Sequence, residues 1–135
     1  MTVRRIFTIE SSHKVLILED DGWERIPWFR KKLPQATMVR NPLQAIEALR
    51  ARCFEVVFLD FDVPCPENRT GLHVAAFLAE MNFSGRVVVH SANPMGAFLM
   101  AKTLRVAGVV TAVSEFGTFG INESDTTRFN LGDIR

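Results

Sequence analysis

Short apolar runs recur along the chain, and stretches with apolar residues at intervals of three and four separate them. A short run rich in Val, Ile and Leu, with polar residues at its ends, is typical of a strand that is covered on both faces. The N-terminal run Val3–Ile9 is a candidate for an additional strand. The sequence predicts five core strands: Lys14–Glu19, Ala36–Val39, Glu55–Asp60, Arg86–His90 and Val109–Val113.

Four helices are predicted between these strands. Two of them start with an Asn-Pro pair, Asn41-Pro42 and Asn93-Pro94, in which Asn is a favoured N-cap and Pro fits the first helical position. The first helix is predicted to start with Asp21 as its N-cap and Glu24 as the reciprocal capping residue, and to end before Pro34. The second helix is predicted to begin at Pro42, the third to cover Gly71–Met81, and the fourth to run from Pro94 to about Ala107. The segment Phe61–Thr70, which contains two prolines, is predicted to be a loop.

The alternation of strands and helices predicts an α/β fold. Connections of this kind join βαβ units, which build a parallel sheet with helices on both faces. We expect a flavodoxin-like, doubly wound, five-stranded parallel sheet with the order 2-1-3-4-5. The chain, 1–135, is then one domain with its core at 14–113 and an N-terminal arm at 1–13. The tail, 114–135, has no apolar period, so we expect it to be irregular and the last helix of such folds to be missing.

Composition narrows the class of protein. The 135 residues are 47% hydrophobic, which is enough for one core, and 16 Lys and Arg against 15 Asp and Glu give a net charge of +1. This balance argues against bulk binding of nucleic acid or of a membrane surface, and no apolar run approaches the roughly 18 residues of a membrane span. A basic face on the first helix, Arg25 with Arg30–Lys32, is typical of a solvated surface or adds attraction for an anionic substrate. With two cysteines and no signal-peptide core in the opening residues, we expect a cytoplasmic protein, whose oligomeric state one chain does not give.

Acidic residues follow two of the predicted strands. Glu19, Asp20 and Asp21 come at the end of the first strand, and Asp60 and Asp62 follow the third, which is its neighbour in the expected order. Carboxylates at close range repel each other unless protons or a hard cation neutralise them, and oxygen ligands suit Mg²⁺ or Mn²⁺. The sequence therefore predicts a divalent-metal site at this edge of the sheet, while Asp21 alone is explained more simply as a helix cap.

The end of the fourth strand offers a different chemistry. Ser91 supplies a hydroxyl, Asn93 supplies an amide, and the helix start at Met95 and Gly96 supplies backbone N–H groups, which favour an anion. His90 adds the residue type that is best suited to proton transfer near neutral pH. A metal site beside an anion site predicts the binding of a phosphate group.

Three of these residues also have a structural interpretation. Consecutive strand residues point to opposite faces, so His90 and Ser91 face the same site only if the strand ends or bulges between them. Otherwise His90 is a packed histidine under a helix. Asn93 is explained as an N-cap, and Asp62 is either a turn former or a site residue.

The acidic segments resemble the receiver domain of two-component response regulators. LILEDD is similar to the acidic end of the first receiver strand, LDFDVP to the phosphoacceptor segment, and Ser91-Ala92 stands where receivers carry Thr/Ser-Ala. The resemblance implies that Asp20, assisted by Glu19 or Asp21, binds Mg²⁺ with Asp60 and the carbonyl of Asp62, and that Asp60 is the phosphorylatable residue. The chain departs from receivers because residues 108–117 contain no lysine and the sequence has no tyrosine.

A closer resemblance is to the receiver-like family that is predicted to process cyclic phosphates. Its hallmarks are an LDxDL-type segment, a G-x-x-V/A helix start and an HSxNPxG motif, which here are Leu59–Val63, with Val63 in place of leucine, Gly71–Ala75 and His90–Gly96. The resemblance covers roughly 14–113. It implies a metal-dependent enzyme, or a former one, that acts on a cyclic or terminal phosphate of a nucleotide or of an RNA end.

The leading hypothesis is therefore a Mg²⁺- or Mn²⁺-dependent phosphoesterase. Its metal ligands are Glu19, Asp20 and Asp60, and its phosphate-binding groups are Ser91, Asn93, Met95 and Gly96. His90 moves the proton, with Asp62 as its alternative or orienting partner, or Asp60 is itself the nucleophile. The alternative is a degenerate receiver that binds a phosphorylated ligand or a protein partner without turnover.

Overall fold

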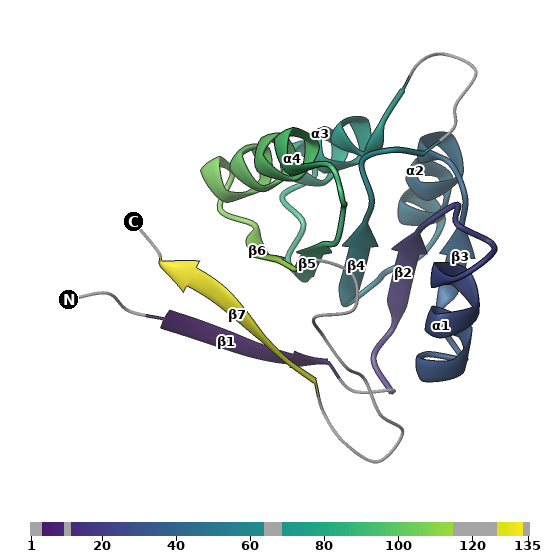
Figure 1. Ribbon diagram of the computed structural model, residues 1–135. Helices are drawn as coiled ribbons and strands as arrows, with labels where there is room; N and C mark the ends of the chain where they lie inside the picture. Colours follow the sequence, from purple (N-terminus) through teal and green to yellow (C-terminus); the bar gives the residue numbers. More distant parts are fainter. Residues whose placement is uncertain (1–3, 10–11, 64–68, 115–126, 134–135) are drawn as a thin grey trace.

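The computed structural model describes residues 4–9, 12–63, 69–114 and 127–133 (Figure 1). Its centre is a five-stranded parallel sheet with the order β3-β2-β4-β5-β6, which confirms the predicted order. The strands of this sheet are β2 (Val15–Leu18), β3 (Thr37–Val39), β4 (Val56–Leu59), β5 (Arg86–Val89) and β6 (Val110–Val113).

The register of the sheet aligns the strand ends. Leu18 of β2 pairs with Leu59 of β4, and Leu59 pairs in turn with Val89 of β5. The residues that follow these three strands therefore lie side by side at one edge of the sheet. This edge is the carboxyl end of the parallel strands, where ligands bind in open α/β sheets.

Helices α2 (Pro42–Ala51) and α4 (Pro94–Val106) start at the two Asn-Pro pairs, as predicted. The side chain of Asn41 accepts the N–H of Gln44 at 2.9 Å, and the side chain of Asn93 accepts the N–H of Gly96 at 3.0 Å. Helix α3 (Gly71–Glu80) is capped by Thr70. None of the helices among the described residues is long and apolar enough to cross a membrane.

Helix α1 (Arg25–Lys32) begins three residues later than predicted, because its N-cap is Glu24 and not Asp21, and the expected capping pair of Asp21 and Glu24 is wrong. The Oδ1 atom of Asp21 accepts the N–H groups of Trp23 and Glu24, so it closes a turn ahead of the helix. The physical reason is Pro27, which is tolerated only in the first turn of a helix because it lacks an N–H and its ring collides with the preceding turn.

The two faces of the sheet have different covers (Figure 1). Helices α2, α3 and α4 pack on one face, over a cluster that includes Leu16, Leu59 and Val87. Helix α1 packs on the other face, where Phe29 meets Ile17 and Phe58.

A two-stranded antiparallel ribbon lies beside the sheet (Figure 1). Strand β1 (Arg4–Ile9) pairs with β7 (Thr127–Asp133), and Ile9 is buried on the α1 face. The N-terminal strand is thus confirmed from residue 4, but the prediction of an irregular tail is wrong for 127–133. The reason is that the partner of β7 comes from the opposite end of the chain. The rest of the predicted tail, 115–126 and 134–135, and the centre of the predicted loop, 64–68, lie outside the described residues, and no helix follows β6 within them.

Candidate functional site

The aligned strand ends bring three carboxylates together. Glu19 and Asp20 follow β2, and Asp60 follows β4. One oxygen from each of the three side chains lies within 4.8 Å of the others. Two of the three residues, Glu19 and Asp60, are buried.

Glu19 is the most firmly held of the three carboxylates. Its Oε2 atom accepts the backbone N–H groups of Asp20 and Asp21, each at 3.1 Å, and His90 donates through Nε2 to Oε1 at 3.0 Å. Burial acts to raise the pKa of Glu19, but the hydrogen bond and charge of His90, the backbone N–H and the charge of Arg25 outweigh it. The pKa of Glu19 is therefore lowered, and this residue is a fixed negative charge at the base of the site.

Asp60 and Asp20 are less well compensated. Burial and the neighbouring charge of Glu19 raise the pKa of Asp60 from 3.8 to about 6, against the charge of His90, a hydrogen bond from Ser91 and the charge of Arg25. Burial and Glu19 also raise the pKa of Asp20. The site therefore carries more negative charge than its own partners neutralise, which favours a bound cation.

Arg25, in the first turn of α1, reaches into this cluster. Its Nη1 atom lies 3.5 Å from Oε1 of Glu19 and 3.6 Å from Oδ2 of Asp60, and its side chain is 20% exposed. Sequence reasoning assigned Arg25 only to a basic helix face. The missed signal was its place on the first turn of the helix that follows the acidic strand end, because this turn must pass close to the same edge of the sheet.

His90 lies beneath the acidic cluster. It is fully buried, and its ring packs edge-on against Phe29 and Phe58 at centroid distances of 5.4 and 6.0 Å. Its Nδ1 atom is buried with no hydrogen-bond partner among the described residues. The structure therefore places His90 on the α1 face, where it contacts Glu19, and not at the open surface of the site.

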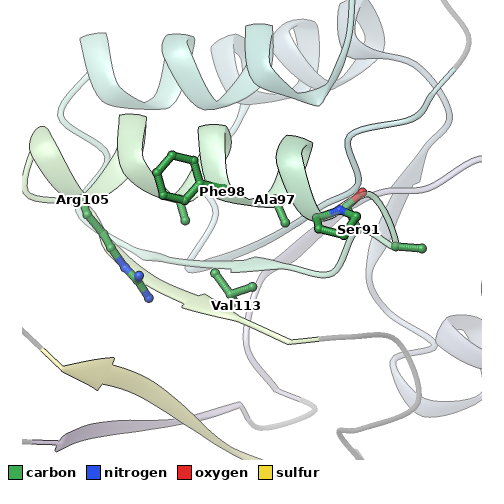
Figure 2. Close-up of a pocket in the computed structure, with 8 residues that line it drawn as sticks. Ser91, Ala97, Phe98, Arg105 and Val113 are labelled. Atoms are coloured by element: carbon green, nitrogen blue, oxygen red, sulfur yellow. The ribbon is translucent and has the colours of Figure 1, made fainter.

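Ser91 points away from His90 toward the other side of the sheet. Although β5 ends at Val89, the N–H of His90 still bonds to the carbonyl of Leu59, so the strand-like alternation extends past the end of the strand. Ser91 lines a groove beside α4 (Figure 2). Its Oγ atom accepts the N–H of Asn93 at 3.1 Å.

The start of α4 lies next to the loop that follows β4. Asn93 donates through Nδ2 to Oδ1 of the exposed Asp62, at 3.5 Å. Gly96, whose N–H is engaged by Asn93, has no room for a side chain, since a Cβ atom there would lie 2.3 Å from the ring of Phe61. Met95 is 66% exposed. Ser91 and Asn93 thus form hydrogen bonds that connect the start of α4 to the loop after β4. Gly96 allows α4 to pack closely against that loop, and Met95 is exposed beside it.

Gly71 was identified in the sequence only as part of the G-x-x-V/A motif, and the structure gives the physical reason for a glycine at this position. A Cβ atom at this position would lie 2.0 Å from the backbone carbonyl oxygen of Asp60. The N–H of Gly71 also donates to the carbonyl of Phe61 at 3.1 Å. The first residue of α3 must therefore be glycine for the helix to pack against the segment that carries Asp60.

Solved structures of response-regulator receivers resemble this chain. Response regulator protein TrrA from Thermotoga maritima, in complex with Mg²⁺-BeF, has a TM-score of 0.60 and 16% identity, over 78% of this chain and 89% of that chain. A receiver domain protein from Methanospirillum hungatei has a TM-score of 0.63 and 11% identity, over 78% and 82% of the two chains. A LuxR-family DNA-binding response regulator from Staphylococcus aureus has a TM-score of 0.56 and 22% identity, over 75% and 84%. At these identities the likeness establishes the receiver fold.

The family is established by the sequence itself. No individually curated protein matches the chain. The profile of the cyclic-phosphate processing receiver domain matches residues 15–106, a range that runs from the start of β2 to the end of α4 and contains every residue of the site. The chain therefore belongs to the cyclic-phosphate processing receiver domain family.

Proposed function

We propose that this protein is a divalent-cation-dependent phosphoesterase that acts on a cyclic or terminal phosphate of a nucleotide or of an RNA end. The observation that carries the proposal is the carboxylate cluster of Glu19, Asp20 and Asp60, in a chain of this family. The pKa of Asp60, raised to about 6, marks a buried acid held in an unfavourable environment, as is common at functional sites.

The residues of the cluster fit a hard cation such as Mg²⁺. The donors are all carboxylate oxygens, which Mg²⁺ prefers, and two of the three acids have raised pKa values that a cation would lower again. Glu19, Asp20 and Asp60 would hold the ion. A structure of the same fold, TrrA, contains Mg²⁺-BeF. When bound, such a cation polarises a phosphate oxygen and lowers the pKa of water.

The chain's own residues orient the phosphate and supply positive charge. The Ser91 hydroxyl bonds to Asp60 and accepts the N–H of Asn93, so it connects the acidic edge to the start of α4. The amide of Asn93 donates one N–H to Asp62. We assign hydrogen bonds to the phosphoryl oxygens to the second N–H of this amide, and to the Ser91 O–H when it turns from Asp60 to the substrate.

Receivers use a lysine at the end of the fifth strand to pair with the phosphoryl group and the metal-binding carboxylate, and we assign this positive charge to Arg25. The segment 108–117, which follows α4 and contains β6, has no lysine, whereas Arg25 on α1 brings a guanidinium to within 3.6 Å of Asp60. We assign to it the neutralisation of the acids before the substrate binds. His90 acts through Glu19, because its ring is buried and its Nε2 atom holds Oε1 of that residue. His90 is therefore a positioning residue, and we assign the proton transfer of the reaction to the exposed Asp62.

Two observations favour the alternative of binding without turnover. The histidine of the HSxNPxG motif is fully buried, and the Gly96 N–H, predicted to hold phosphate, is already satisfied by Asn93. A module that binds a phosphorylated ligand needs only the cation and the Ser91–Asn93 edge.

Phosphorus NMR distinguishes the two functions. The purified protein is incubated with Mg²⁺ and a panel of 2′,3′- and 3′,5′-cyclic nucleotides, beside Asp60→Asn and the matched control Glu47→Gln, an exposed acid on α2. The proposal expects one cyclic phosphate to open in the wild type and in the control, and a loss of at least about a hundredfold in Asp60→Asn. Binding without any ring opening supports the alternative, and full activity in Asp60→Asn overturns the assigned site.

A further inference from the structure

A groove runs along α4 on the side that faces β6 (Figure 2). Its volume is about 350 Å³, which lies within the range of small-molecule sites. Its walls come from both elements and from the β5–α4 connection, and include Ser91, Ala97, Phe98, Ala101, Arg105 and Val113. Apart from Ser91, none of the residues that line this groove has a role in the proposed function.

One end of the groove is shared with the acidic site. Ser91 lines the groove, and its hydroxyl is the group that bonds to Asp60. A phosphate held at the acidic edge would therefore have the rest of its molecule at the mouth of the groove. The two regions are continuous through a single side chain.

The middle of the groove suits a flat ring. Ala97 and Ala101 lie one helical turn apart on α4 and are both buried, so their small side chains leave the space open. Phe98 and Val113, which are 59% and 45% exposed, form apolar walls. An exposed phenylalanine ring at the edge of a groove is a platform on which a nucleobase stacks.

The far end of the groove is cationic. Arg105 lines it, and its Nη2 atom donates to the carbonyl of Thr111 at 3.0 Å, which fixes the guanidinium in place. Figure 2 shows Arg105 and Ser91 at opposite ends, with Ala97 and Phe98 between them. A guanidinium donates to the carbonyl and ring-nitrogen acceptors that nucleobases carry on their edges.

We propose that this groove binds the nucleoside part of the substrate, with the base against Phe98 and its polar edge toward Arg105, while the phosphate lies at the acidic edge. The inference rests on the proposed function and specifies its substrate: a nucleotide is recognised by its base, and a phosphate ester without a base is not. A nucleoside explains the observed order of groups, which is a hydroxyl next to the acids, an apolar slot of ligand size and a fixed cation at the end.

The test is an NMR titration of ¹⁵N-labelled protein with Mg²⁺ and two probes, adenosine 2′,3′-cyclic monophosphate and inorganic phosphate. We expect the nucleotide to shift the amide signals of Phe98, Ala101 and Val113, and phosphate to shift only those near Ser91. Phe98→Ala should weaken nucleotide binding by about fivefold or more, since base stacking is lost, and leave phosphate binding unchanged. The matched control is Val106→Ala, an 81% exposed residue at the end of the same helix.

The outcomes separate this inference from the proposed function. Groove shifts without turnover would keep the nucleoside site and reject the phosphoesterase. Turnover with the same KM in Phe98→Ala and wild type would keep the enzyme and reject the nucleoside site. Shifts in the groove that depend on protein concentration and not on nucleotide would overturn the inference in favour of a contact between two copies of the chain.

A third probe distinguishes the source of the nucleoside. A short RNA that ends in adenosine 2′,3′-cyclic phosphate is compared with the mononucleotide. Equal groove shifts with both probes indicate that the terminal nucleoside alone is recognised, as we expect. No groove shifts with either probe would overturn the inference.

Discussion

The two faces of the central sheet end differently at the same edge. On the face covered by α2, α3 and α4, the inward strand positions Leu18, Leu59 and Val89 complete an apolar cluster. On the face covered by α1, the alternation places Glu19, Asp60 and His90 at the ends of the same three strands, two residues after Ile17, Phe58 and Val88 respectively. Among the described residues these three are the buried titratable side chains, and all lie on the α1 face.

The two faces therefore have different roles, one in stabilising the fold and the other in carrying the candidate site. The face with three helices is a packed apolar core, whose burial stabilises the fold. The face with α1 buries negative charge, which costs stability and, in the proposed function, serves to hold a cation. The two meet where Gly71 of α3 touches the backbone of Asp60.

The largest effect is expected at the junction of the two faces. Gly71→Ala places a Cβ atom 2.0 Å from the carbonyl oxygen of Asp60, so α3 must shift away. We expect a loss of free energy of unfolding on the order of 3 kcal/mol or more, measured by urea denaturation. The control is Gly22→Ala, where the Cβ atom would meet only the end of the Arg40 side chain. Equal losses in the two variants would show that the junction is not constrained.

A gain of stability is expected on the α1 face. Because the pKa of Asp60 is raised to about 6, the folded protein binds the proton of this residue more tightly than the unfolded chain does. The contribution of Asp60 to the free energy of unfolding is therefore greatest below the ordinary pKa near 3.8, and it is lost as the pH rises through about 6. Asn does not ionise. Asp60→Asn should therefore stabilise the protein at pH 7, without divalent cations, by on the order of 2 kcal/mol.

The same variant gives a pH dependence that checks the cause. Urea denaturation at pH 7 and at pH 4 should show that the gain from Asp60→Asn shrinks in acid, because Asp60 is then protonated. The control, Glu47→Gln, should show no such pH-dependent gain. A loss of stability in Asp60→Asn at pH 7 would mean that the Asp60 carboxylate stabilises the fold, and would contradict the expectation that its burial destabilises the protein.

A matched pair of caps separates local structure from function. Asn41→Ala and Asn93→Ala each remove a side-chain acceptor at the start of a helix, from Gln44 and Gly96 respectively. We expect each variant to lose about 1 kcal/mol in thermal or urea unfolding. Only Asn93→Ala should also impair nucleotide turnover or binding, because only Asn93 lies beside Ser91 and Asp62. An equal functional loss in Asn41→Ala would assign both effects to stability.

The smallest effect is expected at Arg25. Its guanidinium competes with a cation for Glu19 and Asp60, so Arg25→Gln should tighten Mg²⁺ binding by a few-fold. Its effect on stability should stay below about 1 kcal/mol, since the side chain is partly exposed. Calorimetric titration with Mg²⁺ measures the first effect, with the exposed Arg30→Gln as control. Weaker Mg²⁺ binding in Arg25→Gln would show that the arginine supports the cation site.

Much of the fold followed from the sequence because buried parallel strands form continuous apolar runs. The order of the sheet followed from the rules for βαβ connections, and the meeting of Glu19, Asp20 and Asp60 followed from that order. These features depend on regular geometry, which repeats from one protein to another.

The features that sequence reasoning missed depend on single contacts. The start of α1 was decided by the conflict between Asp21 as a cap and Pro27 in the helix. The contacts of Arg25 depend on how α1 crosses the strand ends, and β7 pairs with a strand at the other end of the chain. The orientation of His90 was not missed but left open, because it depends on how far the alternation of β5 continues past Val89.

The most direct test of the central claim is a calorimetric titration of the wild type and of Asp60→Asn with Mg²⁺ at pH 7. The division between the two faces predicts that the wild type binds one Mg²⁺ and that Asp60→Asn, although more stable, does not bind it in the same concentration range. Mg²⁺ binding of equal affinity in both proteins, or none in the wild type at millimolar Mg²⁺, would contradict the claim that the α1 face buries its acids to hold a cation.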